Sequence, residues 1–523
     1  MADNHQIVSF CCIFFLKLIC YIINVIPWLS NGSIPNPSWI IQYLLQKTFK
    51  DDKLKKLEFL TQLYHKQGLF RFDSKIYIFN QKLAQTAINK LEKGAENYLD
   101  NSPLKDTFLG SSQKSPETRR AIASLFRKTS IEERASSMTE DIKKMCLKMK
   151  QQSLRSVNIT HWSLRLALDI VGHVLLQLDL NALDGEQDEL LECMVTILHK
   201  CYALNEISTD SDEFKQANEG LDRITSNILK DALEKDDTTI QKRLVVQLHE
   251  ACGFEEAKDN MKLFLMAGTE TTASSIPVVF SLLTDYPNIQ EELRDEAIDR
   301  WSEIMAEPTT SLPKIESLIK EVLRLYPIAP FISRQNNVPV NLGNIHLDEH
   351  SDVVIFTWGI HRSPYLWKDS KVFKPFRFLG EESLQSNMYI PFGAGSRVCI
   401  GQHMAVLELR LAIAILLHTF TFSKNQSTPD LKFVVDWAHA VVHPDKDMIH
   451  GVQTPFLTDP RPLSWCNRKA LGLQGQKFAA VILIIFDHGV PNNLNGLNRD
   501  KPIERRTFQR ATTGVVLGLG RPG

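Results

Sequence analysis

A long run of helical periodicity over residues 253–285 is the feature that most constrains the fold. Tyr286-Pro287 follows it as a stop signal. At a rise of 1.5 Å per residue, such a helix would be roughly 50 Å long, enough to cross a whole domain. We therefore expect it at the centre of the protein. Pro277 lies inside it and is expected to kink the helix or break its hydrogen bonding.

The remaining pattern predicts a mainly α fold with small β-sheets, an α+β protein. Alternating runs at residues 69–79 and 338–356 are typical of strands, and most other segments have helical period. We expect one catalytic domain over residues 27–433. Beyond residue 434 the pattern dissolves and no closing strand pair is evident, so residues 434–523 are interpreted as an atypical tail outside the catalytic fold.

Residues 7–26 are almost all apolar, and a run of this length can span a bilayer. Lys17 and Asn24 interrupt it. We interpret residues 1–26 as a retained membrane anchor. A cleaved signal peptide is disfavoured because the first five residues contain no Lys or Arg. A buried or interfacial helix is the third interpretation.

Charge and cysteine usage exclude several classes of function. The net charge of -1 gives no indication of a nucleic-acid partner. The nine cysteines are an odd number and include no CxxC pair, which fits neither a disulfide framework nor a zinc site. This usage is typical of reduced thiols in a protein that faces the cytosol.

The strongest chemical motif is FGAGSRVCIG at residues 392–401, which combines Phe392, Gly393, Arg397, Cys399 and Gly401. The glycines permit tight turns and a close approach of backbone to a flat ligand. A strong helical pattern follows, so the cysteine should lie at a helix N-terminus, where a thiolate is favoured. A thiolate can bind haem iron, and the arginine can reach a haem propionate.

This motif resembles the haem-binding loop of the cytochrome P450 family. Three further motifs resemble that family in its order, and the resemblance covers roughly residues 68–417. They are AGTETT at residues 267–272, EVLR at residues 321–324 and FKPFRF at residues 373–378. The resemblance implies a haem b held between the long central helix and the cysteine loop, with Cys399 as the metal ligand.

Glu321 and Arg324 are three residues apart and face the same side of a helix. Arg377 is able to join them as a second guanidinium around one carboxylate. In the family such a triad holds the architecture of the haem loop, and a buried triad specifies geometry more than it adds stability. A solvated surface pair is the alternative.

Ala267 and Gly268 have little side-chain bulk, so the long helix can pass close over a haem face. Glu270 and Thr271 place a carboxylate and a hydroxyl beside that gap. The resemblance gives these two residues the role of holding water and relaying protons. The alternative for the threonine is a hydroxyl bonded back to its own helix.

Two arginines are weaker matches. Arg119 resembles a propionate partner of the family, although Ser115 stands where an aromatic residue is usual. Arg334 is a second candidate partner. His403 lies one helical turn after the cysteine and is interpreted as a surface or packing residue.

The resemblance implies a monooxygenase that inserts one atom of O2 into a lipophilic small molecule. Electrons would come from a separate NADPH-cytochrome P450 reductase, and the protein would be anchored in the endoplasmic reticulum membrane facing the cytosol. The alternatives are a haem-thiolate isomerase or lyase and an inactive haem-binding protein.

Overall fold

The computed structural model divides the chain into two units, residues 1–459 and 460–523. All the residues that it describes belong to the first unit, and the predicted anchor lies outside them. The described residues are 34–50, 52–92, 104, 107, 115–152, 156–200, 211–234, 244–380, 389–425, 428–429, 431, 433–436, 441–444 and 446–453.

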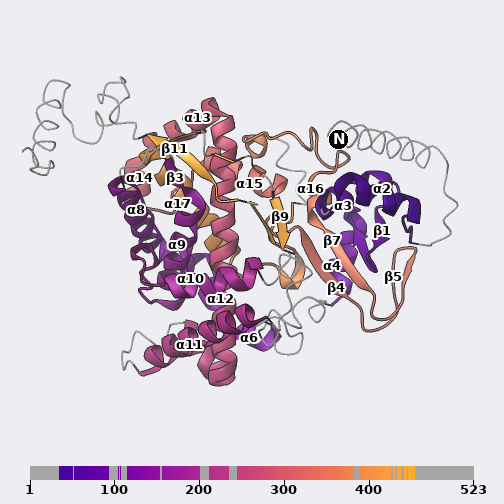
Figure 1. Cartoon of the computed structure of the whole chain (residues 1–523), viewed down its shortest axis with the longest axis horizontal. Coiled ribbons are helices and arrows are strands. Elements are labelled where there is room, and N and C mark those ends of the chain that lie inside the picture. The colour runs from indigo at the N-terminus through magenta and orange to yellow at the C-terminus, as the bar shows by residue number, and fades with distance from the viewer. Residues whose placement is uncertain are drawn as a thin grey trace, which may run out of the picture. The chain divides into compact units, whose positions relative to one another are not determined.

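The long helix is α12, Leu244–Asp285, and it runs through a group of packed helices (Figure 1). The chain bends at Gly253, whose φ of +78° is not helical, so the continuous part begins where the sequence predicts. It ends before Tyr286-Pro287, as expected. Pro277 lies inside the helix and does not end it. The residue of α12 with non-helical backbone angles is Gly253.

Shorter helices surround α12. They are α2 (Trp39–Phe49), α3 (Lys53–Leu63), α4 (Gln81–Lys90), α6 (Ser115–Ile122), α7 (Lys128–Glu132), α8 (Ala135–Gln151), α9 (Ile159–Val171), α10 (Asp188–Val195), α11 (Asp212–Glu234), α13 (Pro287–Asp299), α14 (Trp301–Ala306), α15 (Pro313–Leu325), α16 (Thr357–His361) and α17 (Gln402–Thr419). A π-helical turn, Gly172–Leu176, extends α9.

The main hydrophobic core lies where α9, α12, α15 and α17 meet. Gly268 of α12 allows the closest part of this packing, since a Cβ there would stand 2.8 Å from Cγ2 of Val171 on α9. The small residue expected to leave room for a flat ligand therefore also lets two helices touch. Real Cβ atoms do not approach so closely, and overpacking of this kind destabilises a core.

A second core lies under a four-stranded sheet. Its order is β1 (Leu69–Phe72), β2 (Lys75–Ile78), β7 (Asp352–Phe356) and β4 (Phe331–Gln335). The predicted run at residues 69–79 is a hairpin whose turn, Asp73-Ser74, has positive φ at both residues. The predicted run at residues 338–356 contains β5 (Val340–Leu342), β6 (Ile345–Leu347) and β7.

The structure corrects the expectation that no strand pair follows residue 434. Strand β9 (Phe433–Asp436) pairs antiparallel with β10 (Val441–Pro444). Strand β11 (Ile449–Gln453) joins β3 (Ser156–Asn158) to β8 (Thr421–Ser423). Strands of four or five residues carry little local signal, and β11 also depends on its pairing with the distant β3.

Within the described residues, α12 alone is long and apolar enough to cross a membrane. Its most apolar window is 78% buried inside the protein, as befits a core helix.

We predict that Gly268→Ala lowers the free energy of unfolding by about 1–3 kcal/mol, because the new methyl group meets Val171. Adding Val171→Ala should recover part of this loss, since the two sites share one contact. Urea titration measures both effects. Gly380→Ala is the control: a Cβ there meets nothing within 4 Å. Equal effects of the two glycine substitutions would contradict the close approach.

Candidate functional site

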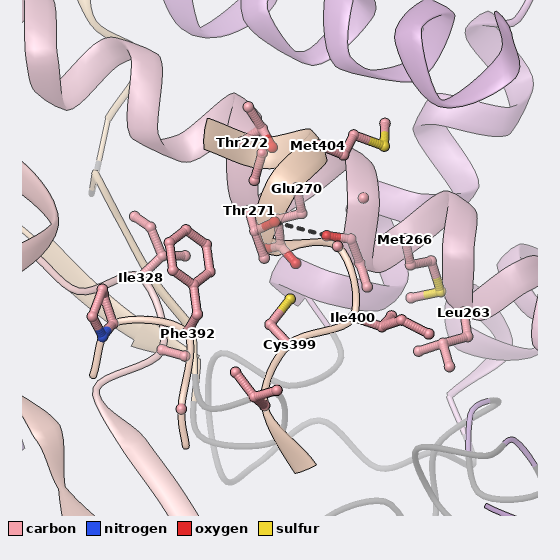
Figure 2. Close-up of a pocket in the computed structure, with 18 of the residues that line it drawn as sticks. Leu263, Met266, Glu270, Thr271, Thr272, Ile328, Phe392, Cys399, Ile400 and Met404 are labelled. Carbon is pink, nitrogen blue, oxygen red and sulfur yellow. Dashed lines mark hydrogen bonds between the residues drawn. The ribbon is translucent and has the colours of Figure 1, made fainter. Parts of the chain in front are cut away.

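A cavity of about 390 Å³ lies between α12 and the loop that precedes α17 (Figure 2). Its volume is typical of a small-molecule site. The structure brings most of the predicted site residues to its wall. These are Arg119, Ala267, Gly268, Glu270, Thr271, Arg334, Phe392, Gly393, Arg397, Cys399 and Gly401.

The cysteine loop is held by its own backbone. The N–H of Cys399 donates to the carbonyl of Phe392 at 2.9 Å. Gly393 and Gly395 both have φ of +75°, a region that favours glycine. A Cβ at Gly395 would stand 2.9 Å from Cγ2 of Ile88 on α4, so this turn also needs a small residue. The glycines thus serve the turn, as the sequence predicts.

The Cys399 sulfur is open to the cavity, although the residue lies deep in the protein (Figure 2). Gly401 is the N-cap of α17, and its backbone hydrogen bond lowers the pKa of the thiol. Burial has the larger effect and raises that pKa above its ordinary value. A metal cation bound to the sulfur would deprotonate the thiol.

Three arginines reach the cavity from different elements. Arg119 of α6 donates from Nη2 to the Val398 carbonyl at 2.5 Å. Burial lowers the pKa of Arg119, and the neighbouring charge of Arg397 lowers it further. Arg334 lies on β4 and is 4% exposed. Cations crowded in this way are stabilised by anionic groups.

These residues fit a haem. The exposed sulfur of Cys399 would bind the iron, and the three arginines match the carboxylates of the propionates. Apolar side chains supply most of the rest of the wall, which suits a flat macrocycle. The side chain of Ser115 lies outside the described residues.

Glu270 and Thr271 both line the cavity from α12. Glu270 is buried, and Thr271 is half-buried. The Thr271 hydroxyl donates to the Ala267 carbonyl at 2.8 Å, which is the alternative that the sequence left open (Figure 2). Its oxygen can still accept a hydrogen bond, so a water in the cavity has a partner there.

Glu321 is the acceptor for both guanidinium groups of the predicted triad. Arg324 donates from Nε to Oε2 at 2.8 Å and from Nη2 to Oε1 at 2.9 Å. Arg377 donates from Nε to Oε2 at 3.0 Å. All three side chains are fully buried in the ion pairs. The arrangement is the buried triad rather than the surface pair.

One carboxylate cannot neutralise two guanidinium groups, and main-chain carbonyls stabilise the excess charge. Arg324 Nη1 donates to the carbonyls of His361 and Ser370, both at 2.7 Å. Arg377 Nη1 donates to the Lys368 carbonyl at 2.7 Å. These bonds tie α15 to the segment that leads toward the cysteine loop.

A chain of hydrogen bonds continues from the triad to that loop. Nε2 of His361 accepts from the N–H of Ile390 at 3.0 Å. The Ile390 carbonyl accepts from the N–H of Gly393, also at 3.0 Å. The triad thereby positions the start of the cysteine loop.

Glu408 of α17 is a cavity residue that the sequence did not single out. Its one signal is an acidic residue within the largely apolar run at residues 404–417. His403 is exposed and does not line the cavity, in agreement with its interpretation as a surface residue.

The family model for cytochrome P450 matches residues 33–450 of the chain. Cytochrome P450 4X1 of Homo sapiens is 26% identical over 439 residues, which cover 76% of this chain and 86% of that protein. Cytochrome P450 4Z1 of Homo sapiens is 33% identical over 257 residues, or 45% of this chain and 51% of that protein. For the latter the match therefore spans about half of the relative's length.

Cytochrome P450 4X1 of Rattus norvegicus is 37% identical over 214 residues, or 38% of this chain and 42% of that protein. Among solved structures, the heme domain of cytochrome P450DA superposes with a TM-score of 0.69 at 18% identity. The superposition covers 80% of this chain and 97% of that domain, and it shows the fold alone.

We predict that Glu321→Ala costs about 3–5 kcal/mol of stability, because it leaves two buried guanidinium groups without their counter-ion. Little or no haem-loaded protein should be recovered. Denaturant unfolding and the haem content per chain measure the effect.

Glu303→Ala is the matched control, since Glu303 pairs with Arg300 at the same spacing but is 54% exposed. Its loss should cost no more than about 1 kcal/mol. A stable Glu321→Ala protein with full haem content would contradict the structural role of the triad.

Proposed function

The chain belongs to the cytochrome P450 family, and from this premise we propose that it is a haem-dependent monooxygenase. The reaction is RH + O2 + 2H⁺ + 2e⁻ → ROH + H2O, where RH is a lipophilic substrate. Family members are oxidoreductases of this kind, and the family and its fold bind haem iron. The electrons come from a separate NADPH-cytochrome P450 reductase.

One observation carries the proposal: Cys399 faces the same cavity as Glu270 and Thr271, from the opposite wall. When bound, the haem supplies the redox chemistry with O2, and a thiolate ligand favours O–O cleavage. Everything else falls to the protein, which must hold the haem, admit the substrate and deliver protons.

Cys399 holds the iron, and Arg119, Arg334 and Arg397 hold the propionates. Phe392, Gly393 and Gly401 shape the wall on the cysteine side, and Ala267 and Gly268 shape the wall on the α12 side. Their shared cavity supports these roles. Arg334 is buried and the other two arginines are half-buried, and propionates are anions that match this positive charge.

Thr271 and Glu270 act in proton delivery. The Thr271 hydroxyl turns from the Ala267 carbonyl to a water in the cavity, and Glu270 exchanges its proton with that water. An isomerase or lyase that rearranges its substrate consumes no protons and has no need of this pair. An inactive haem carrier needs neither residue, so both alternatives are disfavoured.

The cavity wall supports a lipophilic substrate. Away from the arginines, its described side chains are mostly apolar and include Leu104, Leu198, Leu263, Met266, Ile328 and Ile332. Burial of apolar substrate surface against them is the main source of affinity.

The apolar run at residues 7–26 supports a membrane anchor in the endoplasmic reticulum, with the catalytic domain on the cytosolic side. The pairing of β11 with β3 and β8 supports a catalytic domain that continues to Gln453. The atypical tail would begin after that strand.

Cys399→Ser should abolish the red-shifted Soret band of the reduced carbon monoxide complex, because the serine hydroxyl replaces the thiolate ligand. Cys252→Ser is the control: this cysteine is half-buried and does not line the cavity. Its spectrum should equal that of the unmodified protein. Retention of the band in Cys399→Ser would sink the ligand assignment.

Thr271→Ala should keep haem and substrate binding but divert NADPH from product to hydrogen peroxide. Loss of the hydroxyl is expected to lower the yield of product per NADPH by up to roughly 10²-fold. This figure is the small end of the range for general acid–base catalysis. Thr284→Ala is the control, because Thr284 also bonds back to α12 but lies outside the cavity wall. An unchanged yield in Thr271→Ala would remove the residue from proton delivery.

A further inference from the structure

Glu408 is a fully buried carboxyl group on the cavity wall. Among the described residues, neither of its oxygens has a hydrogen-bond partner. An isolated carboxylate in such a place is strongly disfavoured. Burial raises the pKa of Glu408 well above its ordinary value, and the charge of Asp141 raises it further. The group is therefore neutral and carries a proton.

A neutral carboxyl still has a donor and acceptors to satisfy. Thr272 and Ser275 of α12 line the same cavity, and α12 packs against α17. The Ser275 hydroxyl donates to the Thr271 carbonyl at 2.9 Å, so its oxygen remains able to accept. A buried water needs two to four polar partners of this kind. The cavity wall beside Glu408 can supply them.

Asp141, whose charge acts on Glu408, belongs to a hydrogen-bonded chain that reaches solvent. Asp141 lies on α8, which packs against α17, and is 4% exposed. His173 bonds through Nδ1 to Oδ2 of Asp141 at 2.6 Å and through Nε2 to Oδ1 of Asp179 at 2.8 Å. The side chain of Asp179 is 81% exposed.

The geometry of His173 suits proton transfer, because each ring nitrogen contacts a different carboxylate, one buried and one in solvent. His173 lies in the π-helical turn Gly172–Leu176. The hydrogen bond to Asp141 is the main cause that raises the pKa of His173 to about 9, so both nitrogens carry protons at neutral pH.

We propose that Glu408 is the inner end of a proton path that enters at Asp179 and passes through His173 and Asp141. No hydrogen bond joins Asp141 to Glu408 among the described residues, so one water between them and another on the cavity side of Glu408 complete the path. In each transfer Glu408 gives its proton to the water on the cavity side and regains one from the Asp141 side, so one proton moves inward and no other bond changes. The inference rests on the proposed monooxygenase function, which consumes protons.

Infrared spectroscopy of the haem-loaded full chain tests the path without turnover. The carbonyl stretch of protonated Glu408 should be present in the unmodified protein and absent in Glu408→Gln, which keeps the shape of the side chain. Transfer to D2O should shift this band quickly, since the path connects it to solvent.

His173→Gln interrupts the path and should slow that exchange by about tenfold, the rate equivalent of one lost hydrogen bond. The control is Glu140→Gln on the same helix as Asp141, because the Glu140 side chain is 72% exposed. It should leave the exchange unchanged. A missing Glu408 band in the unmodified protein, or equal exchange in His173→Gln, would overturn the path.

Turnover adds a second test. Glu408→Gln should lower the yield of product per NADPH, and an equal yield would overturn a role in delivery. If the unmodified protein forms no product with any substrate while the infrared results hold, the proposed function fails and the proton path stands.

Discussion

The buried contact of one carboxylate with two guanidinium groups is the interaction on which the site depends. Glu321 binds Arg324 and Arg377, and both arginines also donate hydrogen bonds to main-chain carbonyls. Such a group is costly to bury, and its value lies in the geometry that it specifies. That geometry passes through His361 to Ile390 and so to the loop of Cys399.

The opposite wall depends on packing rather than charge. α12 presents Ala267 and Gly268 to the cavity, and Gly268 also lets the helix touch Val171 of α9. One small residue thus serves both the cavity and the core. Cys399 lies on the loop that faces α12, with its sulfur open to the cavity. Burial raises the pKa of its thiol, and a bound metal cation would deprotonate it.

Much of this could be predicted from the sequence where spacing alone decides. The helix over residues 253–285, the glycine turns at Gly393 and Gly395 and the pairing of Glu321 with Arg324 all follow from local periodicity and spacing. What failed depends on tertiary contacts. Strand β11 depends on its pairing with β3, which lies far away in the chain, and the burial that isolates Glu408 comes from helices that are also distant in sequence.

The central claim is that Cys399 would bind the iron of a haem held between α12 and the cysteine loop. X-ray absorption at the iron edge of the purified haem-loaded protein tests this most directly. The account predicts one sulfur atom in the first coordination shell of the iron, together with the nitrogen atoms of the macrocycle. A first shell of nitrogen and oxygen atoms alone would contradict it.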